Sequence, residues 1–592
     1  MGEASLPPFL PFFIGAAVAF FVTGKPRKAL LMLVPVLGLF NLLNLSEGPH
    51  WSLFFLDYKM ELARVDRLSL VFGYIFHLIA FLGFLYAFHV EDLLEQVAAL
   101  FYAGCALGIV FAGDLISLFV FWEMLTVASV FLIWARRNKA SLAAGFRYLL
   151  VHVAGGLILL AGIVLHVRNT GSVELGFLGL KDLATGLIFL GIGVNCAWPG
   201  IHAWLTDAYP EATVTATVFL SAFTTKSAVY VLARAFPGTE ALIWIGAAMT
   251  AFPIFYAVIE NDLRRVLSYS LINQVGFMVC GIGIGTPLAL NGAVSHAFND
   301  ILFKALLFMS MGAVMYRTGR IHATDLGGLY RTMPLTCVFC MVGAASISAF
   351  PLFSGFVSKS MVMEAAALGD MRAVWFVLLF ASAGVFHHAG IKIPYFAFFS
   401  HDSGLRPKEA PVHMLLAMGL TAALCVFIGC APGFLYSLLP YPVDYVPYTG
   451  GHVLGQSQLL FYSSLAFTLL ILSGIYPAEM RATNLDADWF YRKGAGVLNR
   501  ALGRVVPALG DAGPTVFVEG LARGLARLSQ DGPARLLTLF LSPTWLLGEG
   551  AGKGELSKKK QGIRRAVATG AIPVGLGAAV ATLFLFLLLI MS

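Results

Sequence analysis

Charged residues are scarce in this chain of 592 residues: 12% are Asp, Glu, Lys or Arg, whereas 59% are hydrophobic. Soluble domains carry about 25% charged residues, so the chain lacks the charge that a fully water-exposed surface requires. Its mean hydropathy is +0.82. Apolar stretches of the roughly 20 residues needed to cross a bilayer recur almost from end to end. The sequence therefore predicts an all-α polytopic membrane protein.

Motifs for redox cofactors are also missing. The seven cysteines are scattered through apolar segments. The one CxxC pair, Cys337 and Cys340, has no second pair or histidine ligand beside it, so we interpret these thiols as small buried hydrophobic groups. Without an iron–sulfur, haem, flavin or nucleotide motif, we expect no cofactor and no metal, and any redox chemistry would belong to a partner. The moderate net charge of +7 does not indicate nucleic-acid binding.

Sixteen apolar segments are long enough to be transmembrane helices, and two of them contain helix breakers. The segment 183–205 is interrupted at Pro199-Gly200, and the segment 333–368 has Pro351 and Gly355 in its middle. Proline removes a backbone donor and clashes with the preceding turn. Both segments are therefore predicted to be broken helices.

Loop charges predict the orientation, because cytoplasmic loops are enriched in Lys and Arg. The loop 439–456 has neither residue, whereas the loops predicted on the opposite side are basic. The loop 46–67 is an exception. The pattern places the chain in the inner (cytoplasmic) membrane with both termini on the outer, periplasmic side.

The segment 478–570 differs from the rest because it is rich in Arg and amphipathic. Leu521, Leu525 and Leu528 share one helical face, with arginines away from it. Two interpretations remain: an interfacial helix on anionic headgroups, or a lateral strap along neighbouring subunits. A final membrane span is expected at 571–592.

Ionisable side chains inside apolar stretches are the candidate functional residues, because each costs roughly 2.5–3.5 kcal/mol on insertion at bilayer depth. Glu123, in FVFWEMLTVASVF, has apolar neighbours on all sides, so nearby charges would decide whether it holds a proton. Its alternative role is a static ion pair that fixes two helices. Lys226, in SAFTTKSAVYVLAR, is the second candidate, because a buried lysine sheds its proton when its acidic partner is removed.

Three more titratable residues fall on one helical stripe in HAFNDILFKALLF: His296, Asp300 and Lys304 are spaced four residues apart. Such a stripe predicts a proton relay. Lys359 follows the second predicted break, where unpaired backbone groups and trapped water could serve an ion. Lys392 lies near a helix end, where it either joins the path or extends to the membrane surface.

Several strings together resemble one protein family. They are VDRLSLVF (65–72), FWEMLTVASVFLI, HAWLTDAYPEA (202–212), NDLRRVLSYSLINQVGFM (261–278), HAFNDILFKALLF and ISAFPLFSGFVSK. In order, over roughly residues 60–400, they resemble the antiporter-like subunits of respiratory complex I and of Mrp-type Na⁺/H⁺ antiporters. The DAYPEA and TTKSAVY strings are most similar to the D-type member of the Mrp antiporters.

The resemblance implies two inverted five-helix repeats, at 96–235 and 241–398, each with a broken helix. They would be preceded by helices in 1–95 and followed by helices in 411–477. Broken helices at mid-membrane are a transporter design on physical grounds as well. Under this symmetry Lys226 and Lys392 would be counterparts, and Lys359 would lie opposite the neighbourhood of Asn195.

The chain departs from the family at the first broken helix. The family commonly has a lysine there as the partner of the glutamate at Glu123, but this chain reads GVNCAWPGIHAWL, with Asn195 at that place. An amide can hydrogen-bond a carboxyl but cannot titrate. We therefore expect either that Glu123 pairs with Lys226 instead, or that the first half does not pump by the usual scheme. Thr206 also replaces the proline that commonly follows WL.

The function that the resemblance implies is a proton-translocating subunit of a multisubunit Na⁺/H⁺ antiporter of Mrp type, a transporter rather than an enzyme. Its partners would be other integral membrane subunits, protons, Na⁺ and the lipid bilayer. Two alternatives remain: the proton-pumping subunit of a redox-driven complex (complex I-like or a membrane-bound hydrogenase), and the membrane component of an inorganic-carbon uptake system.

Overall fold

The computed structural model describes residues 6–55, 57–477, 479–482, 484–513, 523–524, 532, 534–535, 538–539 and 553–568. The chain divides into two units, Met1–Asp488 and Trp489–Ser592. The expected final span at 571–592 and the leucine face at 521, 525 and 528 lie outside the described residues.

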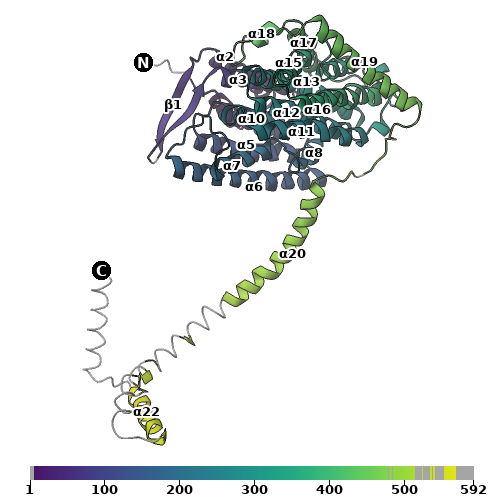
Figure 1. Cartoon of the computed structure of the whole chain (residues 1–592). Helices are drawn as coiled ribbons and strands as arrows, with labels where there is room; N and C mark the ends of the chain where they lie inside the picture. Colours follow the sequence, from purple (N-terminus) through teal and green to yellow (C-terminus); the bar gives the residue numbers. More distant parts are fainter. Residues whose placement is uncertain are drawn as a thin grey trace. The chain divides into compact units, whose positions relative to one another are not determined.

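The first unit is almost entirely helical (Figure 1). In chain order its elements are α1 (Leu10–Ala19), α2 (Gly24–Leu43), β1 (Gly48–Phe55), β2 (Tyr58–Val65), α3 (Arg67–Tyr86), α4 (Leu93–Phe111), α5 (Leu115–Trp134), α6 (Lys139–Thr170), α7 (Leu183–Asn195), α8 (Ala203–Ala208), η1 (Tyr209–Glu211), α9 (Ala216–Ala222), α10 (Thr224–Ala235), α11 (Glu240–Ile259), α12 (Leu263–Ile284), α13 (Pro287–Thr318), η2 (Ala323–Asp325), η3 (Leu329–Arg331), α14 (Pro334–Ile347), α15 (Ser354–Leu368), α16 (Arg372–Val385), η4 (Phe386–Lys392), η5 (Tyr395–Phe399), α17 (Val412–Cys430), α18 (Pro432–Tyr436) and α19 (Gly450–Leu472). The second unit contains α20 (Asp488–Gly513) and α22 (Lys553–Ala568).

Twelve helices in the described part of the chain are long and apolar enough to cross a membrane. Three shorter apolar helices, α1, α7 and α14, accompany them. Several helices begin at an aspartate whose carboxylate accepts hydrogen bonds from the free N–H groups of the first turn. These caps are Asp66 of α3, Asp92 of α4, Asp114 of α5, Asp182 of α7 and Asp262 of α12.

A β-hairpin corrects the all-α expectation. β1 and β2 pair antiparallel, from Gly48 opposite Val65 to Phe55 opposite Tyr58. The hairpin occupies the stretch predicted to be a loop, and Figure 1 shows it at one edge of the first unit. Ala63 and Val65, which share one face of β2, are buried, and so is Met60 on the other face. β2 packs on α3, α4 and α5. The short strands lack the long apolar run that distinguishes a membrane helix in a sequence.

Both predicted helix interruptions are present. Residues 196–202 separate α7 from α8, and residues 348–353 separate α14 from α15. Two residues after each first half-helix an alanine adopts a left-handed conformation, with φ +58° at Ala197 and +56° at Ala349. The two breaks therefore turn the chain in the same way.

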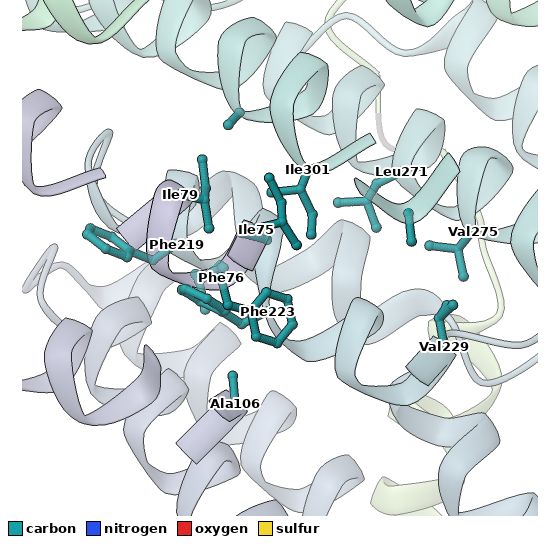
Figure 2. Close-up of a cluster of buried hydrophobic side chains, with 14 of the residues drawn as sticks. Ile75, Phe76, Ile79, Ala106, Phe219, Phe223, Val229, Leu271, Val275 and Ile301 are labelled. Atoms are coloured by element: carbon teal, nitrogen blue, oxygen red, sulfur yellow. The ribbon is translucent and has the colours of Figure 1, made fainter. Parts of the chain in front are cut away.

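Helix α13 lies at the centre of the first unit, where it packs against α3, α9, α12, α14, α15 and α17. Figure 2 shows the apolar core on one side of it, where Ile301 of α13 lies near Ile75 of α3 and Leu271 of α12. Phe219 and Phe223 contribute aromatic rings to the same core. His296, Asp300 and Lys304 of α13 are thus fully buried within packed protein.

Candidate functional site

The centre of the site is an ion pair between two fully buried side chains. Lys226 Nζ on α10 lies 2.6 Å from Asp300 Oδ2 on α13, and neither side chain is exposed. The same ammonium group donates a hydrogen bond to the carbonyl oxygen of Ser221, at 3.0 Å. Ser221 belongs to α9, which is separated from α10 at Phe223. The pair thus joins an interrupted helix to the central helix of the unit.

The predicted stripe on α13 is present, and it is buried along its whole length. Lys304, one turn after Asp300, donates from Nζ to Ser270 Oγ on α12 at 2.6 Å. His296, one turn before Asp300, has its two ring nitrogens 3.1 Å from Ser358 Oγ and 3.1 Å from Gln274 Oε1. Every polar partner along this stripe comes from a neighbouring helix.

Lys359 extends across the second helix break. Its Nζ donates to the carbonyl oxygen of Ile347, the last residue of α14, at 3.0 Å. The carbonyl end of a helix is the negative end of its dipole and attracts a cation. The ammonium also lies 5.0 Å from the centre of the Phe277 ring, a cation–π distance. Lys359 is therefore held by the break, as predicted.

Lys392 is buried, so the interpretation that it extends to the membrane surface is wrong. Its Nζ donates to the carbonyl oxygens of Val258 at 2.6 Å and Glu260 at 2.7 Å. It also lies 2.7 Å from Glu479 Oε1. The reason is that the chain beyond α19 returns over this helix end and supplies a carboxylate. In the same π-helix, η4, the buried ring of His388 lies within the electrostatic influence of both Lys304 and Lys392.

Glu123 on α5 lies against the backbone of α6. A β-carbon placed on Gly156 would be 1.8 Å from Glu123 Oε1, so glycine is what admits the carboxyl group. Within the described residues, Oε1 has no hydrogen-bond partner and the side chain makes no ion pair. The predicted Glu123–Lys226 pair is therefore wrong. Lys226 is paired with Asp300, because α10 packs against α13.

Asn195, at the end of α7, has a partner that the sequence did not reveal. Its Oδ1 lies 2.8 Å from His152 Nδ1 on α6. The imidazole ring packs on Tyr148, at 4.0 Å between ring centres, and on Trp204, at 4.4 Å. His152 lies one turn before Gly156 on the same face of α6, the glycine against which Glu123 packs. A titratable ring thus lies beside the position where a lysine was expected.

Two functional candidates were missed from the sequence, His152 and Glu479. A histidine at four-residue spacing from a glycine in VHVAGG was a weak signal for the first. Glu479 gave no signal, because it follows a membrane helix in an irregular stretch. Among the described residues, no group of three or more His, Cys, Asp or Glu side chains could hold a metal ion.

Most of the candidate residues lie in a region that is similar to a known protein family. Residues 112–387 match the family described as NADH:quinone oxidoreductase/Mrp antiporter, transmembrane. The A/B-type component of a probable K⁺/H⁺ antiporter of Rhizobium meliloti is 28% identical, over 71% of this chain and 46% of its own length. Hydrogenase-4 component B of Escherichia coli is 28% identical, over 55% of this chain and 56% of its own. The A-type component of a Na⁺/H⁺ antiporter of Alkalihalophilus pseudofirmus is 29% identical, over 63% and 52%.

The chain spans about half the length of these curated relatives. Because they are A-type antiporter components and a hydrogenase component, the greater similarity to the D-type Mrp component stays a prediction.

Solved multisubunit membrane complexes contain chains of the same fold. A chain of the Mrp complex from Dietzia sp. DQ12-45-1b superposes with a TM-score of 0.66 at 20% identity, covering 78% of this chain and 99% of that one. A chain of the archaeal membrane-bound sulfane sulfur reductase gives 0.68 at 24% identity, covering 88% and 95%. Respiratory complex I from Thermus thermophilus gives 0.64 at 22%, covering 73% and 99%. The part of this polytopic membrane protein that includes Glu123, Lys226, Asp300, Lys304 and Lys359 is thus the part that matches the NADH:quinone oxidoreductase/Mrp antiporter family.

Proposed function

We propose that this chain is the proton-translocating subunit of a multisubunit cation/proton antiporter of Mrp type, with Na⁺ as the exchanged cation. The observation that carries the proposal is the fully buried Lys226–Asp300 pair, continued along α13 by Lys304 and His296. Buried charges of this kind are costly and contribute little net stability compared with packed apolar side chains. Their concentration on one central helix favours ion conduction over a structural role.

The pair suggests how protons advance. When Asp300 takes up a proton, the ammonium of Lys226 loses its counter-charge in a medium of low dielectric, so uptake of a proton by the carboxylate favours its release from the lysine. Lys304 lies one turn from Asp300, so the Asp300 carboxylate can interact electrostatically with both Lys226 and Lys304. Loss of a proton from Lys226 therefore changes the electrostatic potential at Lys304. In this proposal the proton transfer then continues from Lys304 toward Lys359 and His296.

Glu123 supplies the first half of the path in this proposal. Its carboxyl lies against Gly156, one turn from the His152–Asn195 contact. A neutral imidazole can accept a proton on one nitrogen and release one from the other. His152 therefore takes the place of the lysine that Asn195 replaces, and connects Glu123 toward the broken helix α7–α8.

We also propose that the chain has sixteen membrane spans, with inverted repeats at 96–235 and 241–398. The repeat assignment is supported by the two breaks, which share a left-handed alanine two residues after the first half-helix. The remaining domain limits at 1–95, 411–477, 478–570 and 571–592 follow from this arrangement. Both termini would face the outer side of the inner membrane, and 478–570 would lie along headgroups or neighbouring subunits.

A second candidate is the proton-pumping subunit of a redox-driven complex. Two observations favour it. One relative is a hydrogenase-4 component, and the sulfane sulfur reductase chain covers 88% of this chain and 95% of its own length. The buried residues would do the same work in either complex, with a redox partner in place of a cation gradient as the driving force.

Proton flux in inverted vesicles that contain the complete native complex tests the proposal. We expect Na⁺ to drive flux in the wild type, Lys226→Ala to abolish it, and Lys408→Ala, at an exposed loop lysine, to leave it unchanged. Because one relative is named as part of a K⁺/H⁺ antiporter, K⁺ is tested in parallel. Flux that appears only with a redox donor would assign the chain to the second candidate. Unchanged Na⁺-driven flux in Lys226→Ala would contradict the proposed path.

A further inference from the structure

The chain beyond α19 returns to the helical core in an irregular segment, described at 479–482 and 484–486, that lies outside the membrane helices. Its side chains contact parts of the first unit that are far apart in sequence. The contacts are Glu479 Oε1 to Lys392 Nζ at 2.7 Å, Arg481 Nη2 to Asp325 Oδ2 at 2.5 Å, Asn484 Nδ2 to Glu260 Oε2 at 3.1 Å, and Asp486 to His202 at 3.0 Å and to Tyr269 at 2.7 Å. This segment therefore covers the place where Lys392 lies.

The two acidic residues of this segment, Glu479 and Asp486, have pKa values shifted in opposite directions. Asp486 lies beside the imidazole of His202 and accepts a hydrogen bond from the Tyr269 hydroxyl. Burial acts to raise the pKa of Asp486, but these contacts outweigh burial and lower it. Glu479 has the Lys392 ammonium, 2.7 Å from Oε1, as its one polar side-chain partner among the described residues. Burial raises the pKa of Glu479, against the opposing effect of Lys392. Asp486 thus has two partners that favour its charged form, His202 and Tyr269, whereas Glu479 has one, the Lys392 ammonium, which is also the group that could give it a proton.

The surroundings of Glu479 connect a buried amine to water. The charged and titratable groups that act on it are Lys392 of η4, Glu260 between α11 and α12, and Tyr476 after α19. Glu260 and Arg481 line an adjoining polar cavity of about 480 Å³, which is ample for water. Glu479 therefore lies between a fully buried lysine and two residues, Glu260 and Arg481, that line a cavity large enough to hold water.

We propose that Glu479 is a proton-conducting residue, which exchanges a proton between the Lys392 ammonium and the water of this cavity. The step is balanced: an N–H bond of Lys392 breaks, an O–H bond forms on Glu479, and the neutral carboxylic acid then gives its proton to water. The neutral Lys392 amine is protonated again from the buried line of the second half. This inference rests on the proposed proton-translocating function, to which it adds the exit residue.

Two isosteric variants, Glu479→Gln and its control Asp486→Asn, together with the shortened Glu479→Asp, test the inference in the complete native complex. Glu479→Gln keeps the shape of the side chain but cannot titrate, and we expect it to lower proton flux at least roughly tenfold. Glu479→Asp should retain part of the flux with a displaced pH profile. Asp486→Asn, in the same segment, should lower thermal stability and leave the flux per assembled complex unchanged.

Infrared difference spectra between acid and neutral pH give a readout that does not depend on transport. We expect a protonated-carboxyl band that disappears in Glu479→Gln and persists in Asp486→Asn. Wild-type flux in Glu479→Gln, or a spectrum in which that variant loses no carboxyl band, would overturn the inference. Absence of any flux in the wild type would instead contradict the proposed function, and the carboxyl band would still report whether Glu479 takes up a proton.

Discussion

Lys226 and Asp300 are 2.6 Å apart across α10 and α13, and water reaches neither side chain. They belong to different predicted five-helix repeats, so this one contact joins the two predicted repeats electrostatically. Protonation on one side of the contact is therefore felt on the other.

The first prediction concerns the buried pair. Asp300→Asn leaves the Lys226 ammonium without a counter-charge, and breaking a buried pair in this way costs about 3–5 kcal/mol. We expect a marked fall in the thermal unfolding temperature of the detergent-solubilised complex. The double variant Lys226→Gln/Asp300→Asn removes both charges and should recover much of the loss. Stability losses that simply add in the double variant would show that the pair is not energetically coupled.

The second prediction concerns the glycine beside Glu123. In Gly156→Ala the new methyl group would overlap the carboxyl group, at 1.8 Å from Oε1, so Glu123 has to move. We expect proton flux to fall while assembly is retained. Gly186→Ala, in α7, meets no atom within 4 Å and should leave flux unchanged. Equal flux in both variants would argue against a role for the observed position of Glu123.

The third prediction concerns the contact that replaces the missing lysine. Asn195→Ala leaves His152 Nδ1 without its partner, and an unsatisfied buried polar group costs about 1–3 kcal/mol. We expect lower thermal stability and reduced flux from the same variant. His152→Phe keeps an aromatic ring between Tyr148 and Trp204 but cannot titrate, so it should be well folded and low in flux. Normal flux in His152→Phe would exclude the ring from the proton path.

The fourth prediction is a pH dependence at the start of α3. Asp66 accepts from Ser69 N–H at 2.9 Å and from Arg234 Nη2, at the end of α10, at 2.8 Å. Burial acts to raise the pKa of Asp66, but the contacts with Arg234 outweigh it and lower the pKa below 3.8. A lowered folded-state pKa means that the carboxylate stabilises the fold above 3.8, and that this stabilisation is lost as the pH falls through the lower folded-state value.

Asp66→Asn keeps a side chain that can cap α3 but removes the charge opposite Arg234. It should therefore lower the unfolding temperature near neutral pH, by the equivalent of about 1 kcal/mol at most for a partly exposed ion pair, and the difference from wild type should shrink in acid. Asp182→Asn is the matched control, because Asp182 caps α7 through Thr185 without an arginine partner in the described structure. A gap between wild type and Asp66→Asn that stays constant down to strongly acidic pH would contradict this assignment.

The spans could be predicted from composition, because hydrocarbon excludes unpaired backbone groups and forces long apolar stretches into helices. Pro199 and Pro351 located both helix breaks, because proline lacks a backbone donor. The four-residue spacing of His296, Asp300 and Lys304 placed them on one stripe, because residues four apart are neighbours on a helix. The β-hairpin at 48–65 was not predicted, because its strands are too short to show the long apolar run that identifies a membrane helix.

What the sequence determined by itself is which ionisable groups lie within apolar helices, since composition and helical periodicity are local properties. Only the tertiary structure decided their partners. Lys226 pairs with Asp300 rather than Glu123, Asn195 meets His152, and Lys392 is neutralised by Glu479 from 87 residues further along the chain. Partner choice depends on which helix faces pack together and where the chain returns, and no local pattern encodes that.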